Sequence, residues 1–174
     1  MMTLEEALAG KEIPPEIEQL QVLLDLPYCG FDGARHTGQM IVHRELAGEV
    51  QQIFAEIFAA RFPIARMIPV AAYSWSDDAS MADNNSSAFN YRLAVGKSNL
   101  SQHAHGRAID INPVQNPYIK GDMVLPPGAV YDPAVAGTLV ADGPVVAAFE
   151  ARGWVWGGRW TTLKDWHHFE KREA

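Results

Sequence analysis

Residues 101–113 read SQHAHGRAIDINP, and this stretch joins a polar, histidine-bearing loop to a short apolar run. Ile109 and Ile111 flank Asp110 within that run, which predicts a short strand closed by an asparagine and a proline. Because side chains alternate along a strand, we expect Asp110 to point away from the face that the two isoleucines occupy. The stretch therefore predicts a loop that carries His103, followed by a strand that carries a carboxylate.

A second histidine cluster suggests how this carboxylate is used. His167 and His168 stand near the C-terminal end, in a segment that reads as a final strand. Catalytic zinc takes three protein ligands from His, Asp or Glu and keeps one position open for water. His103, Asp110 and His168 meet that requirement. The alternative is that these histidines lie in the core or on the surface with ordinary hydrogen-bond partners, and spacing alone leaves both interpretations open.

Composition excludes several classes of protein. With 174 residues, 48% of them hydrophobic, the chain is long enough and apolar enough for one folded domain. Its 14 basic and 21 acidic residues give a net charge of −7, which argues against a nucleic-acid binder. No apolar run approaches the roughly 18–20 residues of a membrane span. The single cysteine, Cys29, excludes an internal disulfide framework and a cysteine-based structural zinc site.

The start of the sequence shows no basic segment followed by an apolar run of about 7–15 residues, as a secretory signal would. We therefore expect a protein that is cytoplasmic, exported by another route, or given without its leader.

The remaining sequence predicts short elements in an α+β order. Helices are expected at about 4–9 after a capping-box pattern, at 46–61 with apolar residues every three or four positions, and from Pro144 to just before Gly153. Because strands concentrate after the first helices, we expect a single α+β domain in which a small antiparallel sheet carries the metal site and packs against helices. Strands are predicted at 40–43, 67–73, 108–111, 154–156 and around 168–169, and loops at 28–38, 74–90 and 116–133.

Three ordered motifs give the sequence a family resemblance. The pattern Ser-x-His-x-x-Gly-x-Ala-x-Asp at 101–110, with Asp-x-x-His-Phe at 165–169, resembles the D-alanyl-D-alanine carboxypeptidase family of zinc peptidases. This family includes the VanX and VanY types and the phage L-alanyl-D-glutamate endolysins. The segment 86–92 resembles the family's segment that ends in a catalytic-site arginine. The match covers roughly residues 31–171, which suggests an N-terminal helical extension of unknown role at 1–30 and a zinc peptidase domain at 31–174.

The resemblance implies a role for individual residues. Zn²⁺ would be bound by His103, Asp110 and His168. Asp165 would take the place of the general base, a position where dipeptidase members have Glu and the endolysin branch has Asp. Arg92 would hold or polarise the scissile carbonyl and stabilise its oxyanion, an effect typically worth about 3 kcal/mol.

Three neighbouring side chains have more than one interpretation. Ser101 and Glu170 would either orient the metal ligands or make local turn and strand-end hydrogen bonds. We favour His168 over His167 as the ligand, because adjacent residues of a strand face opposite ways and His167 lies only two residues after Asp165. Two further carboxylates in the polar loop, Asp77 and Asp78, are interpreted as solvated.

The expected function is hydrolysis of peptidoglycan stem peptides by metal-activated water, of the D-Ala-D-Ala carboxypeptidase or L-Ala-D-Glu endopeptidase type, by a monomer. This substrate would lie in the cell envelope. The alternative is a catalytically silent, zinc-containing binding module of the same fold. A non-haem iron oxygenase is disfavoured, since its histidine and carboxylate commonly stand two residues apart and His103 and Asp110 stand seven apart. A cysteine peptidase would rest on Cys29 without a recognisable histidine partner.

Overall fold

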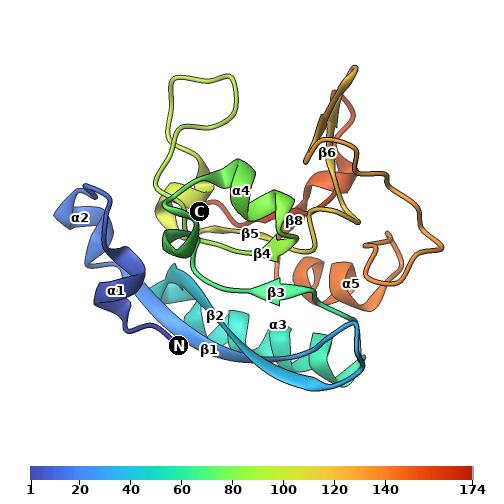
Figure 1. Cartoon of the computed structure of the whole chain (residues 1–174), viewed down its shortest axis with the longest axis horizontal. Coiled ribbons are helices and arrows are strands. Elements are labelled where there is room, and N and C mark those ends of the chain that lie inside the picture. The colour runs from blue at the N-terminus through green and yellow to red at the C-terminus, as the bar shows by residue number, and fades with distance from the viewer. Residues whose placement is uncertain (174) are drawn as a thin grey trace.

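The N-terminal third of the chain forms a long hairpin that packs on a helix (Figure 1). In this computed structural model, which describes residues 1–173, β1 and β2 pair antiparallel from Gln21 opposite His43 to Cys29 opposite Arg35. The helices are α1 (Leu4–Leu8), α2 (Pro15–Glu18), α3 (Ala47–Ala59), α4 (Asp77–Ala82) and α5 (Pro144–Glu150), with 3-10 turns η1 (Arg44–Leu46), η2 (Val70–Tyr73), η3 (Gln102–His105) and η4 (Gly157–Arg159). The strands are β1 (Gln21–Cys29), β2 (Arg35–His43), β3 (Arg66–Met67), β4 (Asn85–Ser86), β5 (Ala108–Asp110), β6 (Tyr118–Lys120), β7 (Met123–Leu125), β8 (Val155–Trp156), β9 (Lys164–Asp165) and β10 (His168–Glu170).

The core lies between α3, the hairpin, α5 and a three-stranded sheet. Val50, Ile53, Phe54 and Ile57 recur on one face of α3 and are almost completely buried, as the spacing of apolar residues predicts. The sheet has the order β5-β10-β8 and is antiparallel throughout. The predicted single α+β domain, with a small antiparallel sheet packed against helices, is confirmed.

The middle strand of this sheet is anchored in the core through one aromatic ring. Phe169 is fully buried and stacks on Phe149 of α5 with ring centroids 4.0 Å apart. Side chains alternate along β10, so the neighbours of Phe169 in sequence, His168 and Glu170, point to the opposite face of the strand. Packing of one ring thus fixes which way two polar side chains face.

The first residues of the chain cover the outer face of β2. Helix α1 begins with the predicted capping box, in which Thr3 accepts from the backbone of Glu6 and donates its own backbone N–H to that side chain. A second apolar cluster joins α1 to the middle of the chain, with Leu8 and Ala7 packed against Ile41 and Phe89. The boundary predicted at residue 30 lies in the turn between β1 and β2. Within residues 1–173, no helix is both long and apolar enough to cross a membrane.

Two predictions of local structure in the first half were wrong. The loop predicted at 28–38 is a turn at 30–34, because β1 continues to Cys29 and β2 begins at Arg35. Gly38 is a strand residue, and it is needed there because a Cβ atom would lie 2.5 Å from the Met67 side chain where β3 passes. The strand predicted at 67–73 ends at Met67, and after Pro69 the chain turns into η2.

Two predicted loops also contain regular structure. The segment 74–90 holds α4 and β4, and Ser76 caps α4 by accepting from the backbone N–H of Ala79. The segment 116–133 holds the β6–β7 hairpin, and β6 pairs with β9 on its other side. These elements are two to six residues long, too short to show a hydrophobic period, and contacts with distant segments stabilise them.

Candidate metal centre

Three elements bring the predicted metal ligands together. His103 lies in η3, Asp110 ends β5 and His168 begins β10, where it pairs directly with Asp110 across the sheet. Directly opposed residues of an antiparallel pair project to the same face with Cβ atoms about 4.5–5.5 Å apart. The ligand atoms of all three side chains lie within 4.8 Å of one another, and all three residues are buried. The sheet register therefore places two of the three predicted ligands, and η3 adds the third.

The distances between these atoms suit a tetrahedral ion. His103 Nε2 and His168 Nδ1 are 3.2 Å apart, and oxygens of Asp110 lie 3.2 Å from the first nitrogen and 3.0 Å from the second. Ligands at the 2.0–2.2 Å bond lengths of zinc are separated by about 3.3 Å along the edges of a tetrahedron. The three groups thus form one face of a site that fits an ion of this size.

A hydrogen bond on the far side of each imidazole turns the other ring nitrogen toward the metal group. His103 Nδ1 donates to the backbone carbonyl of Ala88, and His168 Nε2 donates to the carboxylate of Glu170 at 3.2 Å. A neutral imidazole carries one N–H, so with these outer hydrogen bonds made, a metal ion would meet lone pairs on His103 Nε2 and His168 Nδ1. A buried group of two imidazoles and a carboxylate attracts a cation, either a proton or a metal ion, to its centre.

The pKa values of these residues show how strongly the group attracts positive charge. Burial lowers the pKa of His168, but its hydrogen bonds to Asp110 and Glu170 outweigh burial and raise that pKa to about 10. Burial opposes ionisation of Asp110, yet His103 and His167 hold its pKa well below the usual range. A divalent cation would take the place of the proton that the group otherwise binds.

Glu170 contacts the ring of a predicted ligand, whereas Ser101 makes the local turn hydrogen bond that was its alternative interpretation. Glu170 accepts from His168, and its second oxygen is 2.8 Å from Arg172 Nε. Against the effect of burial, His168 and Arg172 lower the pKa of Glu170 to about 2, so it is a carboxylate at neutral pH. Ser101 caps η3, where its hydroxyl accepts from the backbone N–H of His103 at 3.3 Å.

Asp165 lies at the end of β9, beside the metal group and in the same cleft. Its Oδ1 is 3.0 Å from His167 Nε2, and its side chain is 14% exposed. β9 approaches η4 closely, since a Cβ atom on Gly157 would lie 2.4 Å from the Asp165 carbonyl oxygen. A glycine at position 157 therefore permits this placement of the carboxylate.

His167 faces Asp165 rather than the centre of the metal group. Its Nδ1 donates to the backbone carbonyl of Asn116 at 2.6 Å, and its Nε2 is 3.8 Å from the nearer oxygen of Asp110. Burial lowers the pKa of His167, but Asp165 and Asp110 outweigh it and raise that pKa to about 9. The group whose ligand atoms converge thus contains His168, and His167 is a neighbour of the carboxylate at 165, a contact that no sequence pattern indicated.

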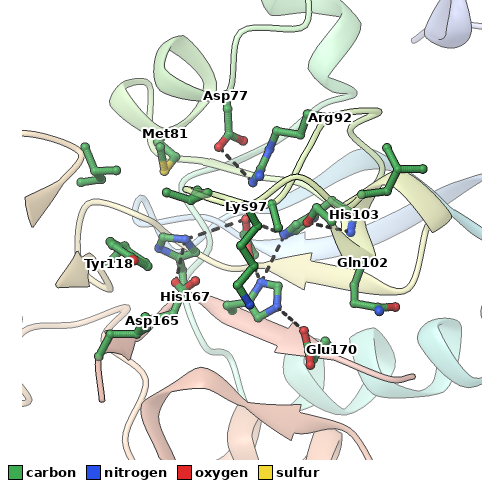
Figure 2. A pocket seen from close by; sticks show the side chains of 18 of the residues that line it. Asp77, Met81, Arg92, Lys97, Gln102, His103, Tyr118, Asp165, His167 and Glu170 are labelled. Atoms are coloured by element: carbon green, nitrogen blue, oxygen red, sulfur yellow. Dashed lines mark hydrogen bonds and ion pairs between the residues drawn. The ribbon is translucent and has the colours of Figure 1, made fainter. Parts of the chain in front are cut away.

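Arg92 enters the same cleft from the segment that follows β4, and Figure 2 shows it joined to Asp77. Its Nη2 is 3.0 Å from Asp77 Oδ2, and Nη1 donates to the backbone carbonyl of Leu93. The interpretation of Asp77 as a solvated loop residue is therefore wrong, because this carboxylate begins α4 and is an ion-pair partner about one-quarter exposed. Ser76 before two aspartates is a helix-start signal that could have indicated α4.

The cleft has a volume of about 320 Å³, at the lower end of the range for small-molecule sites. Apolar and aromatic side chains form part of its walls, and three cations reach it. Lys97 crosses the front of the site in Figure 2, and Arg172 pairs with Glu170 at its edge. The walls include Tyr118, Leu125, Trp160 and Leu163.

Comparison with known proteins gives one family match. A family model described as D-alanyl-D-alanine carboxypeptidase matches residues 94–171. The matched segment contains the three metal-group residues and Asp165, and it begins two residues after Arg92. No curated protein and no solved structure gives a significant match.

Proposed function

Because a family model described as D-alanyl-D-alanine carboxypeptidase matches residues 94–171, we propose that the chain is a zinc-dependent peptidase that hydrolyses peptidoglycan stem peptides. The observation that carries the proposal is the buried group of His103, Asp110 and His168, whose ligand atoms all lie within 4.8 Å of one another. Two imidazoles and one carboxylate are a ligand set of catalytic zinc sites.

Zinc bound at such a site polarises a carbonyl and lets water lose a proton near neutral pH. Glu170 supports the ligand His168 by accepting its outer N–H, which keeps the inner nitrogen free for the ion. The backbone carbonyl of Ala88 has the same effect on His103.

Asp165 is suited to the role of general base. Its carboxylate lies in the cleft, is open to water over part of its surface, and stands beside the metal group. A carboxylate in that position can take a proton from the attacking water and give it to the leaving amine. The contact with His167 limits the directions in which this carboxylate can turn.

Arg92 supplies a fixed positive charge on the same cleft. A cation aimed at the carbonyl oxygen stabilises the negative charge that develops there when water attacks, and such donors are typically worth about 3–4 kcal/mol. Arg92 is suited to this because its guanidinium is already held by Asp77 before substrate binds.

The cleft favours a short peptide with a free carboxylate. A volume of about 320 Å³ suits two or three small residues better than a long strand. Lys97 and Arg172 place positive charge at its edge, where a substrate carboxylate can bind. We propose a D-Ala-D-Ala carboxypeptidase or an L-Ala-D-Glu endopeptidase, acting as a monomer, and Asp at position 165 favours these over a strict dipeptidase.

The test is product analysis. The zinc-loaded chain is incubated with purified muropeptides that end in D-Ala-D-Ala, and the products are identified by mass spectrometry. Release of free D-Ala indicates a carboxypeptidase, whereas a new D-Glu amino terminus indicates the endopeptidase. Asp165→Asn is the matched control and should bind zinc but release nothing. A zinc-loaded wild-type chain that cuts neither bond would contradict the proposal and favour a silent binding module.

A further inference from the structure

The guanidinium of Arg92 is held by one carboxylate from a distant segment. Asp77 Oδ2 lies 3.0 Å from Arg92 Nη2, and only 22% and 25% of the Arg92 and Asp77 side chains are exposed. Arg92 Nε is buried and has no hydrogen-bond partner among the described residues, so the Asp77 contact is the charged contact that fixes the end of the side chain. Asp77 itself is fixed because it stands in the first turn of α4, capped by Ser76.

The same carboxylate is tied to the segment that carries Arg92. Asn90 Nδ2 donates to Asp77 Oδ1 at 3.2 Å, so the two oxygens of Asp77 bind side chains two residues apart. Asn90 is buried, and its backbone N–H donates to the carbonyl of His103 at 3.1 Å. Asp77 therefore connects the arginine to the backbone of a metal-group residue through a single intermediate side chain.

Packing from behind keeps α4 in place. Trp75, two residues before Asp77, donates its indole N–H to the carbonyl of Ala9 at the end of α1. Its ring meets Phe89 edge-on with centroids 6.1 Å apart, next to Asn90 in sequence. Ser74 and Trp75 both have left-handed backbone conformations, which the surrounding contacts must stabilise. The segment before Asp77 and the segment before Arg92 are thus packed against each other.

We infer that Asp77 is a positioning residue for Arg92: it sets the direction of the guanidinium across the cleft before substrate binds. This inference rests on the proposed function, in which Arg92 stabilises the scissile carbonyl, because Asp77 would act only by holding Arg92 in place for that role. Asp77 touches no reacting atom and acts through Arg92. A carboxylate that instead held Arg92 back from substrate would have the opposite effect on turnover.

Kinetics of the zinc-loaded full chain test the inference. Asp77→Asn should lower kcat about tenfold and change KM less than threefold, with an unchanged zinc content, because the guanidinium is displaced while the metal group is intact. Asp83→Asn is the control: it removes the same charge at the other end of α4, from an exposed ion pair with Arg66 that lies outside the cleft. We expect this control to change kcat less than twofold.

A double variant separates positioning from a general structural effect. If Asp77 acts through Arg92, Asp77→Asn should not lower the kcat of Arg92→Ala further. A further loss in that background, a kcat of Asp77→Asn equal to that of the wild type, or a raised kcat would each overturn the inference. Asp77→Glu, which keeps the carboxylate, should recover part of the loss.

A measurement without turnover keeps the two proposals apart. NMR of the ¹⁵N-labelled chain detects the Arg92 guanidinium, assigned by its loss in Arg92→Lys. Rotation of this group should be slow in the wild type and in Asp83→Asn, and fast in Asp77→Asn. A wild-type chain that cuts no muropeptide but shows this difference would contradict the proposed function and leave the positioning contact standing. Equal rotation in all three proteins would overturn the inference itself.

Discussion

Glu170→Ala should weaken zinc binding because Glu170 fixes the tautomer of His168. The carboxylate accepts the outer N–H of His168 at 3.2 Å, its side chain is 10% exposed, and its pKa of about 2 keeps it charged. Removing such an acceptor next to a metal ligand typically costs 10–100-fold in affinity, which corresponds to about 1.4–2.7 kcal/mol. Glu170→Gln keeps an acceptor oxygen without the charge, so its loss should be smaller.

The assay is competition for zinc between the protein and a chromophoric chelator at pH 7.5. Arg172→Ala is the control variant, because Arg172 contacts the same carboxylate but its side chain is 74% exposed. An exposed ion pair contributes about 0–1 kcal/mol, so this variant should bind zinc within about fivefold of the wild type. If Glu170→Ala bound zinc as tightly as the wild type, the tautomer argument would be refuted.

Three further outcomes are expected. Asp165→Ala should keep one zinc ion per chain and lose turnover; loss of the metal as well, measured by elemental analysis, would contradict its role as a base. Phe149→Ala should lower the free energy of unfolding by about 3–5 kcal/mol in a urea titration, because Phe149 is buried against Phe169; a loss under 1 kcal/mol would refute the described core. Burial and Arg107 lower the pKa of His43 in the folded chain. As the pH drops from 7 to 5, the unfolded chain therefore takes up a proton at His43 before the folded chain does. The free energy of unfolding should fall over this range. In metal-free protein, His43→Asn should reduce that pH dependence, and identical urea midpoints against pH for both proteins would contradict the assignment.

The three residues that the sequence predicts as metal ligands lie together in the structure, and they could be singled out because their pattern is local. Two of the three residues fall within one stretch of ten, and Asp110 ends the short strand that Ile109 predicted. The third, His168, follows from a second motif, and the pairing of β5 with β10 then brings both strands into register. Helix α3 was predicted for a similar reason, since thirteen residues show a clear apolar period.

Tertiary contacts explain what the sequence did not predict. Asp77 and Arg92 are fifteen residues apart, and the packing of α1, Trp75 and Phe89 lies behind the segments that carry them. The contact of His167 with Asp165 depends on a hydrogen bond to Asn116, fifty-one residues earlier. The short hairpin of β6 and β7 exists because β9 pairs with it. Such elements have no period of their own, and their sequences resemble loops.

The most direct test of the central claim is the metal content of the purified chain, measured together with chelator-sensitive hydrolysis of muropeptides. The account expects about one zinc ion per chain in the wild type and in His167→Ala, and none in His168→Ala. Hydrolysis should stop when the ion is removed and return when zinc is added back. A wild-type chain that binds no zinc after reconstitution, or a metal retained by His168→Ala and lost by His167→Ala, would contradict the site described above.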